Sequence, residues 1–534
     1  MRKAFLLGII LLFAFIVRIV GINEVPLYGD ELTITQDAYS ILQTGKDVTG
    51  KTLPLTFSMG AGRPGGYVYF SVPFVSLFGP GAYGVRMLSI ISGVGIVLAG
   101  YLLSRKLFSE KIAIITAFLT AISPWAINLS RGGYEANFAL MLCMFAIYAF
   151  LEAKGKPICY PISAALLGLT IFTYPTFKLT IPLFIIPLLW YVGGIKEIFV
   201  KKNIFYLLVS IIIGISFIGL SINETFNNNS EERFGRINIF SSEDIQRNIT
   251  EEVINERRIV DVSYADRLFH NKVIKNVEYF IENYLDNFSI QYLFTKGDGN
   301  PRHNMTQTGV LFTVEILTLL LGLYAISQKE KKGMIMLLSW VLITPIATSI
   351  VGVPHSLRNA FMFPALSMIS AYGVFLLSSN KRKIVFTLFV LGLFVQFIFQ
   401  MERLYLVSAK EYEKSWSYPA KRASEIAASE TDRYDHVILS DRIDSVEYAY
   451  PVYARVDSKL VQEQNLNTSL IGSLPLKTYG NVSIGRIPEG ELPKFIDSIP
   501  GSVLFIGSEY YDIKSGEVIK FTDPMLNLSI VRKE

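Results

Sequence analysis

Long apolar segments alternate with short polar connections over the first 400 residues of the chain. A helix needs about 20 mostly apolar residues to cross the hydrocarbon core of a bilayer. The segments that approach this length are 4–22, 83–104, 112–129, 136–151, 158–176, 179–195, 204–222, 309–327, 334–352, 359–379 and 384–401. The pattern predicts an α-helical polytopic membrane protein with about eleven transmembrane helices. Of these, 136–151 is short, and Pro182 and Pro187 predict a kink in 179–195.

The basic residues support this count because their clusters fall on alternate connections. The clusters are Arg2/Lys3, Arg105/Lys106/Lys111, Lys154/Lys156, Lys196/Lys201/Lys202, Lys329/Lys331/Lys332 and Lys381/Arg382/Lys383. The short connections on the other side carry only Arg131, Lys178 and Arg358. Since basic residues favour the cytoplasmic side, we expect a multi-pass protein of the cell membrane, with its N-terminus in the cytoplasm and its C-terminus outside.

Composition agrees with a membrane protein and narrows its chemistry. Of the 534 residues, 51% are hydrophobic and 18% are charged, whereas soluble domains carry about 25% charged residues. The net charge of +5 is not gathered on one basic face, so nothing supports nucleic-acid binding. Cys143 and Cys159 lie in or beside apolar runs, which implies neither a disulfide framework nor a cysteine metal site. The first apolar run is too long for a typical signal-peptide core, so we expect it to be retained.

This topology places three large polar pieces outside: a loop at 23–82, a stretch at 223–308 and a tail at 402–534. We therefore expect a transmembrane module over 1–401 and a small extracytoplasmic α/β domain over 402–534, with β-rich runs at 436–440 and 502–507. In the first outer loop, 32–42 and 67–78 predict helices lying along the membrane interface. Gly60 to Gly66 between them predicts a flexible turn.

An acidic pair, Asp30 and Glu31, follows the first span after about eight residues. Two interpretations are open for it. Asp30 is a favoured N-cap residue, and Glu31 in a first turn suits the helix dipole. Alternatively, Asp30 acts as a general base that takes a proton from an acceptor hydroxyl, with Glu31 beside it. The two interpretations are compatible, since a carboxylate has two oxygens.

Cationic residues at the outer ends of the expected helices are candidates for binding an anionic group. They are Arg131, Lys178, Arg302, His303, His355 and Arg358. Each could also be an ordinary interfacial residue. Glu315 lies inside an expected span and must face protein, where it either binds substrate or is held by the helix bundle. No His/Cys/carboxylate set has a firm metal-binding spacing and the first loop lacks Asp-x-Asp, so we expect no metal site.

Arg18, a short spacer, Pro26 and then Asp30-Glu31 after a first transmembrane helix resemble the opening of the GT-C glycosyltransferases. The likeness is to the protein O-mannosyltransferases and the aminoarabinose transferases that modify lipid A (glycosyltransferase family 39/83-like), and it extends loosely to about residue 400. It implies a catalytic Asp in the first outer loop, a polyprenyl-phosphate sugar donor, inversion of the sugar and no catalytic metal. It also matches Arg86 to an Arg that opens the second span in mannosyltransferases.

The combination predicts an inverting transfer of a monosaccharide from a polyprenyl phosphate to a hydroxyl of a protein, a glycolipid or a cell-surface glycan. A phosphate loop and a Gly-x-Ser-x-Gly elbow are both absent, which counts against an ATP-driven pump and a serine hydrolase. The alternative is a transporter or flippase of lipid-linked saccharides, although few ionisable residues lie within the spans and no repeated halves are evident. An oligosaccharyltransferase is less favoured, because Trp-Trp-Asp is absent.

Overall fold

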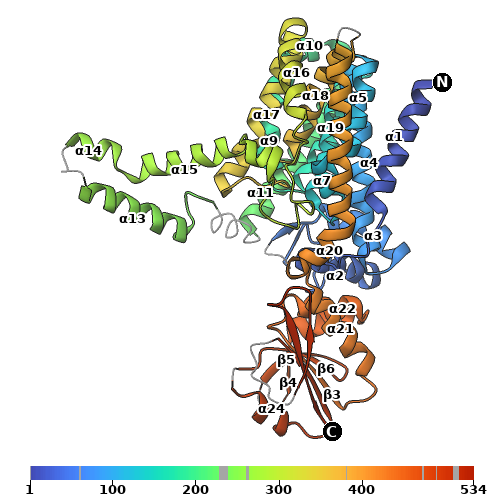
Figure 1. Cartoon of the computed structure of the whole chain (residues 1–534), viewed down its shortest axis with the longest axis vertical. Helices are drawn as coiled ribbons and strands as arrows, with labels where there is room; N and C mark the ends of the chain where they lie inside the picture. The colour runs from blue at the N-terminus through green and yellow to red at the C-terminus, as the bar shows by residue number, and fades with distance from the viewer. Residues whose placement is uncertain are drawn as a thin grey trace. The chain divides into compact units, whose positions relative to one another are not determined.

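The computed structural model describes residues 2–58, 62–227, 238–259, 264–379, 382–471, 474–488, 490–508 and 516–534. By contacts between residues, the chain forms two compact units (Figure 1). The first comprises Met1–Arg18, Ile90–Ser130 and Tyr134–Met401, and the second comprises Ile19–Ser89, Arg131–Gly133 and Glu402–Glu534. Gly60 and Ala61, within the expected flexible turn, and Lys381 lie outside the described residues.

The first unit is helical. Its elements are α1 (Arg2–Ile19), α4 (Ala82–Leu107, entering from the second unit), α5 (Glu110–Ile122), α6 (Pro124–Arg131), α7 (Glu135–Glu152), α8 (Cys159–Ile171), α9 (Phe177–Tyr191), α10 (Ile195–Ile198), η1 (Lys201–Asn203), α11 (Ile204–Asn227), α13 (Glu243–Ile259), α14 (Tyr264–Phe269), α15 (Lys272–Asp286), η2 (Gln291–Thr295), α16 (Glu315–Lys329), α17 (Lys331–Val351), η3 (Ala360–Met362), α18 (Phe363–Leu377) and α19 (Lys383–Glu402). Each of the expected apolar segments is helical over most of its length.

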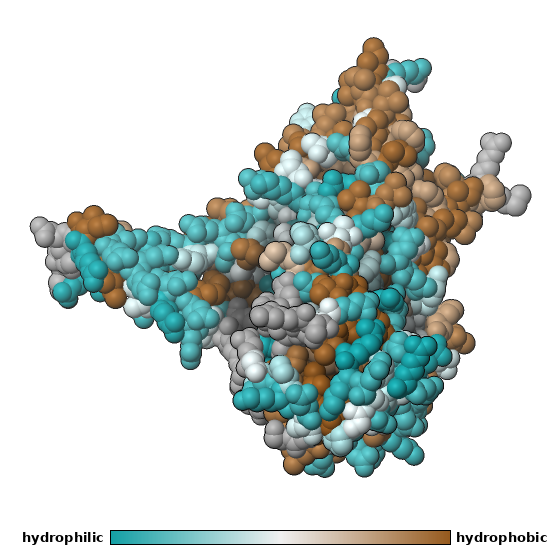
Figure 2. Space-filling view, turned by 60° about the horizontal axis from the view of Figure 1, so that its bottom comes forward, coloured by the Kyte–Doolittle hydropathy of each residue, from teal (hydrophilic) through white to brown (hydrophobic). Residues whose placement is uncertain are grey.

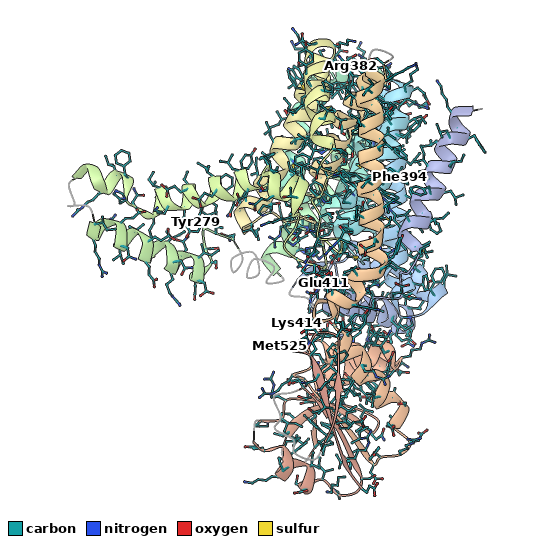
Figure 3. All side chains as sticks on the ribbon, viewed as in Figure 1. Tyr279, Arg382, Phe394, Glu411, Lys414 and Met525 are labelled. Atoms are coloured by element: carbon teal, nitrogen blue, oxygen red, sulfur yellow. The ribbon has the colours of Figure 1, made fainter. Side chains whose placement is uncertain are left out.

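The chain is a multi-pass membrane protein. Among the described residues, six helices are long and apolar enough to cross a membrane, or up to seven if the bent pair α5 and α6 forms one span. The helices α3 (Gly66–Phe78), α8 and α9 are apolar but shorter. Exposed hydrophobic side chains are numerous on α1, α11 and α19, and hydrophobic surface gathers over the upper helices in Figure 2. On α19, which begins just after Arg382, Phe394 is 61% exposed and suits contact with lipid (Figure 3).

Buried Arg18 compensates for the break between α5 and α6, where the helix axis bends by 53°. Pro124 lacks an N–H, so carbonyl groups in the preceding turn lose their usual helical donors. Arg18 Nη1 donates to the carbonyl oxygen of Ala121 at 3.0 Å, and Arg18 Nε donates to Ser130 Oγ at 3.1 Å. A charge that is costly in a membrane is thereby used to join α1 to the broken helix.

The second unit combines the first outer loop with the C-terminal residues. The loop forms α2 (Gly29–Thr44), the hairpin β1 (Thr56–Phe57) and β2 (Arg63–Pro64), and α3; the C-terminal part begins with η5 (Arg403–Val407), α20 (Ser408–Glu411) and η6 (Glu413–Trp416). Its other helices are α21 (Tyr418–Glu430), α22 (Val446–Tyr453), α23 (Ser458–Leu466) and α24 (Leu492–Ser498). Both expected interfacial segments of the loop are helical, as α2 and α3.

A seven-stranded sheet forms the core of the C-terminal part, in the order β4-β5-β6-β3-β7-β9-β8. The strands are β3 (His436–Ser440), β4 (Ser469–Ile471), β5 (Leu474–Tyr479), β6 (Val482–Gly485), β7 (Val503–Gly507), β8 (Glu517–Lys520) and β9 (Asn527–Lys533). The central β3 runs parallel to β6 and β7, and the other pairs are antiparallel. Ile438 and Phe505 of the sheet pack with Phe495 of α24 in a buried cluster.

Helix α2 packs against C-terminal helices of the same unit. Gln36 Nε2 donates to the carbonyl oxygen of Tyr448 in α22 at 3.2 Å. Gln462 Nε2 in α23 donates to Ser40 Oγ and Thr44 Oγ1, both at 2.9 Å. Most side chains of α2 are therefore buried against protein, whereas the sequence predicted a helix with one face open to the membrane interface.

Candidate active site

Asp30 and Glu31 lie next to each other in the first turn of α2 but have different environments. The N-cap of this helix is Tyr28, so Asp30 is not the N-cap. The Asp30 side chain is 59% exposed, and its Oδ1 accepts from Nη2 of Arg63 at 2.9 Å. Glu31 is fully buried. Consecutive residues of a helix point about 100° apart, which explains why one carboxylate reaches the surface and the other the core.

Arg63 holds Asp30 in place from the β1–β2 hairpin. Its Nη1 donates to the carbonyl oxygen of Asp30 at 3.1 Å and to Thr33 Oγ1 at 2.7 Å. The Arg63 side chain is nearly buried, at 6% exposure, so in this ion pair Arg63 is enclosed by protein and Asp30 is accessible. The carboxylate is consequently held in position through Oδ1 although the side chain is largely exposed. The sequence alone did not single out Arg63, because the hairpin that brings it to α2 shows no strong strand pattern.

Glu31 and Arg86 form a buried, bidentate ion pair. Arg86 Nε donates to Glu31 Oε1 at 2.7 Å, and Arg86 Nη2 donates to Glu31 Oε2 at 2.6 Å. The backbone N–H of Gly133 donates to Oε1 at 2.7 Å, and that of Tyr28 donates to Oε2 at 3.4 Å. With two donors on each oxygen, the Glu31 carboxylate is already saturated, so it is suited to positioning rather than to proton transfer.

Arg86 also directs its remaining donors at protein. Nη1 donates to the carbonyl oxygens of Ile22 and Val25 at 2.7 and 2.9 Å, and Nη2 donates to that of Pro26 at 2.8 Å. A guanidinium group has five N–H donors, and these contacts together with those to Glu31 use all of them. Arg86 thus closes the segment that follows the first span and has no donor left for a phosphate.

Arg131 is a second buried cation of this unit. Its Nη1 donates to the carbonyl oxygen of Val20 at 2.5 Å and its Nη2 to that of Gly21 at 3.3 Å. The guanidinium group lies 5.1 Å from the ring centroid of Tyr405. At 5% exposure, Arg131 is better suited to holding the chain at the end of the first span than to binding a ligand.

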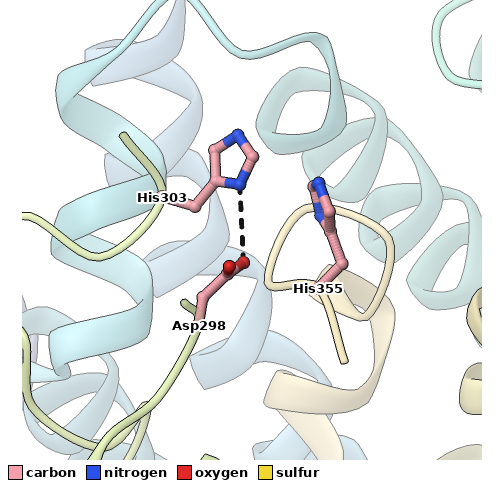
Figure 4. Close-up of side chains that lie close together, drawn as sticks. All are labelled: Asp298, His303 and His355. Carbon is pink, nitrogen blue, oxygen red and sulfur yellow. Dashed lines mark ion pairs between the residues drawn. The ribbon is translucent and has the colours of Figure 1, made fainter. Parts of the chain in front are cut away.

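His303 and His355, which the sequence suggested as candidates for binding an anionic group, meet an acidic residue in the first unit (Figure 4). Nδ1 of His303 lies 3.4 Å from Oδ2 of Asp298, and the ring centroids of His303 and His355 are 4.4 Å apart. Burial and the neighbouring His303 lower the pKa of His355 to about 3. Burial also opposes ionisation of Asp298, but contact with His303 and other donors outweighs it and lowers the pKa of Asp298 to about 2.

Hydrogen bonds hold the loop that carries Asp298 and His303. Asn304 Nδ2 donates to the carbonyl oxygens of Lys296 and Asp298, at 2.7 and 3.1 Å. A side chain at Gly297, where φ is +72°, would lie 2.7 Å from that amide nitrogen, so the turn requires glycine. Ser356 donates its backbone N–H to Asp298 Oδ2 at 2.6 Å, which links the loop directly to the His355 segment.

The remaining candidates differ in their surroundings. Lys178 is exposed at the start of α9, and Arg302 and Arg358 are partly exposed beside His303 and His355. Glu315 faces protein, as expected: it is 3% exposed, its Oε1 accepts from the backbone N–H of Phe312 at 3.2 Å, and its Oε2 accepts from Ser370 Oγ at 2.9 Å. These contacts favour a structural role for Glu315 at the start of α16.

An apolar cavity of about 170 Å³ lies within the helices of the first unit. Side chains from α7, α8, α9 and α11 line it, including Ile147, Leu167, Phe184 and Leu207. Its lining is suited to a hydrocarbon chain rather than to a polar ligand.

Known proteins resemble this chain in part of its sequence and in its fold. The family model described as dolichyl-phosphate-mannose-protein mannosyltransferase matches residues 63–220. None of the curated proteins matches the chain by sequence. ArnT from Cupriavidus metallidurans, in the apo state and bound to undecaprenyl phosphate, superposes with a TM-score of 0.55 at 12% identity over 98% of both chains. The Archaeoglobus fulgidus oligosaccharyltransferase tethered with an acceptor peptide gives a TM-score of 0.50 at 14% identity, over 85% of this chain and 63% of that one.

Proposed function

We propose that this chain, which resembles the GT-C superfamily glycosyltransferases of the protein mannosyltransferase and ArnT type, transfers a monosaccharide from a polyprenyl phosphate to an acceptor hydroxyl. The acceptor is a hydroxyl of a protein, a glycolipid or a cell-surface glycan. The observation that carries the proposal is that the adjacent carboxylates of Asp30 and Glu31 have different environments. Glu31 is saturated by buried donors, whereas Asp30 is exposed and held in place by Arg63.

In the proposed reaction, Asp30 is the general base. Its carboxylate takes the proton of the acceptor hydroxyl as that oxygen attacks the anomeric carbon of the sugar. The bond from the anomeric carbon to the phosphate oxygen breaks, and the polyprenyl phosphate leaves with the bonding electrons. Attack opposite to the leaving group inverts the configuration of the sugar. The step requires no metal or cofactor.

Different residues are proposed to stabilise the phosphate as its negative charge develops. Arg302 and Arg358 are the best candidates, because they are cationic and partly exposed, whereas Arg86 and Arg131 are buried. The apolar cavity lined by Phe184 and Leu207 is a candidate site for part of the prenyl chain.

The proposed topology has eleven crossings, a cytoplasmic N-terminus and extracytoplasmic residues 402–534, in the plasma membrane. Contacts within the second unit support it. Residues in direct contact lie on one side of the membrane, so Gln36 of the first loop and Tyr448 of the tail share a side, as do Glu31 and Gly133. An even number of crossings must therefore separate the two residues of each pair. The proposed topology has ten crossings between the first loop and the tail. It has two between Glu31 and Gly133 when α5 and α6 are counted as one span.

The topology is tested by labelling single cysteines in a chain without Cys143 and Cys159. We expect Lys51→Cys and Asp497→Cys to react with a membrane-impermeant maleimide on intact cells, and Lys329→Cys to react only after lysis. Labelling of Lys329→Cys on intact cells, or protection of Lys51→Cys, would reverse the proposed orientation.

The function is tested by release of polyprenyl phosphate from its sugar conjugates in proteoliposomes supplied with membrane extract as acceptor. Loss of a general base typically lowers the rate by 10² to 10⁴, so Asp30→Asn should lose most of its activity. The matched control is Asp497→Asn, an exposed Asp of the same unit. Transfer by a correctly inserted Asp30→Asn protein at the rate of the control would exclude Asp30 as the base.

Variants of the cationic residues test the phosphate assignment separately. Arg302→Ala and Arg358→Ala are expected to lower kcat/KM for the donor, because they would remove a cation from the developing phosphate charge, whereas Arg131→Ala is expected to lower the yield of folded protein. An unchanged kcat/KM for the donor in both of the first two variants would reject them as phosphate ligands, whatever the role of Asp30.

A further inference from the structure

The side chains of Asp298, His303 and His355 form a cluster in which hydrogen bonds do not account for every nitrogen atom. The potential ligand atoms of these side chains all lie within 4.8 Å of one another. Nδ1 of His303 and Nδ1 of His355 are buried and have no hydrogen-bond partner. Leaving a buried polar atom without a partner costs about 1–3 kcal/mol, so two such atoms in one cluster require an explanation.

A hydrogen bond between histidine and aspartate does not supply that explanation. The 3.4 Å separation between His303 Nδ1 and Asp298 Oδ2 exceeds the usual range for a charged pair. Oδ2 already accepts the Ser356 N–H at 2.6 Å, and Oδ1 accepts the Asn300 N–H at 2.9 Å. The carboxylate is thus oriented by one backbone donor on each oxygen and retains acceptor capacity for a further ligand.

We propose that Asp298, His303 and His355 bind one divalent transition-metal ion of the Zn²⁺ class. Two imidazoles and a carboxylate suit Zn²⁺, Co²⁺, Fe²⁺ or Mn²⁺ better than Mg²⁺ or Ca²⁺, which prefer oxygen ligands alone. Bonds of about 2.0–2.1 Å in a tetrahedral site place neighbouring ligand atoms about 3.3 Å apart. The separation of 3.4 Å between His303 Nδ1 and Asp298 Oδ2 is close to this value, and a separation of 4.8 Å would close to it with a combined side-chain movement of about 1.5 Å.

The surrounding structure holds these ligands in place without an ion. The Tyr134 ring packs edge-on against His303 at 5.6 Å between centroids, and its hydroxyl donates to the carbonyl oxygen of Arg302. Trp125 Nε1 donates to the carbonyl oxygen of Ser356 at 3.0 Å, which fixes the segment beside His355. Such support from outside the ligand set is typical of metal sites.

The proposed ion would bridge two connections of the first unit, and the proposal does not rest on the glycosyl transfer proposed above. Asp298 and His303 lie between η2 and α16, whereas His355 follows α17. A shared ion would join these connections and stabilise the folded chain by an amount that grows with the logarithm of the ion concentration relative to Kd. Three protein ligands leave one position of a tetrahedral site for water.

The test is the metal content of the full-length chain, purified in nanodiscs through a tag without histidine, equilibrated with Zn²⁺ and dialysed. We expect about one Zn²⁺ per chain by inductively coupled plasma mass spectrometry. His303→Gln, His355→Gln and Asp298→Asn should each lower retention at least tenfold. His270→Gln is the matched control, because His270 binds Glu256 through Nδ1 at 2.9 Å, away from the cluster, and it should retain the ion.

Reconstitution with Co²⁺ keeps the proposal testable if the variants fold poorly. The wild-type chain should show the visible absorption of a tetrahedral nitrogen and oxygen site and should unfold at a higher temperature than the chelated protein. Absence of a bound ion from the wild type, or full retention by correctly folded variants of the proposed ligands, would overturn the proposal. Neither result bears on the activity of Asp30→Asn, so the two proposals can fail separately.

Discussion

Replacing Glu31 by Gln tests the buried ion pair that organises the second unit. The substitution keeps the shape of the side chain but removes its charge, so the guanidinium group of Arg86 stays buried without a counterion. It also turns one acceptor oxygen into an N–H donor, which must then face a donor from Arg86, Gly133 or Tyr28. Glu31→Gln should therefore destabilise this unit strongly, although the change is small in volume.

The expected loss follows from the burial of both partners, which are 0% and 1% exposed. Removing one partner of a buried pair costs about 3–5 kcal/mol, whereas an exposed pair contributes at most about 1 kcal/mol. Lys106 and Glu152 form the matched control, with an equally short contact of 2.7 Å but exposures of 41% and 25%. Glu152→Gln should consequently have little effect on stability.

The assay is denaturant-induced unfolding in mixed micelles, followed by tryptophan fluorescence. Trp416 is a local reporter because it is fully buried and its ring lies 5.6 Å from the Arg86 guanidinium carbon. A chain with Trp416→Phe identifies its share of the signal. The double variant Glu31→Gln/Arg86→Met should lose less free energy of unfolding than the sum of the losses of the two single variants, because Arg86→Met removes the charge that Glu31→Gln leaves without a counterion. Equal midpoints for Glu31→Gln and Glu152→Gln, or strict additivity, would refute the reasoning.

Three further predictions concern pH, packing and the proposed base. Burial raises the pKa of Asp37 from 3.8 to about 7, so the folded state binds this proton more tightly than the unfolded chain does. The proton bound to Asp37 therefore stabilises the folded state, fully below about pH 4, and this contribution is lost as pH rises through 7. Asp37→Asn should abolish the difference between unfolding midpoints at pH 5 and pH 8, and persistence of that difference would assign it to another group. A Cβ at Gly93 would collide with Ser130 and lie 2.8 Å from Arg18 Nε, whereas Gly214 has open space; Gly93→Ala should lose about 1–3 kcal/mol and Gly214→Ala nothing, measured by the same unfolding assay. Arg63→Met should lower kcat while leaving the donor KM unchanged, and a change confined to KM would contradict a role in positioning Asp30.

The helices of the first unit could be located from hydropathy, but their ends could not. The segment 309–327 was expected to be helical throughout, yet α16 begins at Glu315. Before that residue, the backbone N–H of Val310 donates to the carbonyl oxygen of Tyr292 at 3.3 Å, and that of Leu311 to Leu293 at 2.8 Å. The apolar residues Val310 and Leu311 therefore form backbone hydrogen bonds with another segment instead of a helix, and hydropathy averaged over a window does not detect such contacts.

The candidate site was predictable only where its residues adjoin in sequence. Asp30 and Glu31 were visible as a pair, but Arg63 reaches Asp30 through a hairpin 33 residues away. Asp298 and His303 are close in sequence, whereas His355 joins them only because the Ser356 N–H binds Asp298. The expectation that no metal-binding spacing exists was an argument about local sequence, and this cluster forms through tertiary structure.

The structure around α2 gives the adjacent residues Asp30 and Glu31 different roles: Asp30 is accessible, and Glu31 holds the helix in place. A general base at a membrane surface, the role proposed for Asp30, must be accessible to its acceptor and fixed in position, and these demands conflict for one flexible side chain. The helix resolves the conflict by turning about 100° between Asp30 and Glu31. Glu31 ties the first turn to Arg86 and to the Gly133 backbone, and Asp30 remains exposed on that immobilised turn. A change at Glu31 should therefore reduce transfer by displacing Asp30, even though Glu31 itself exchanges no proton.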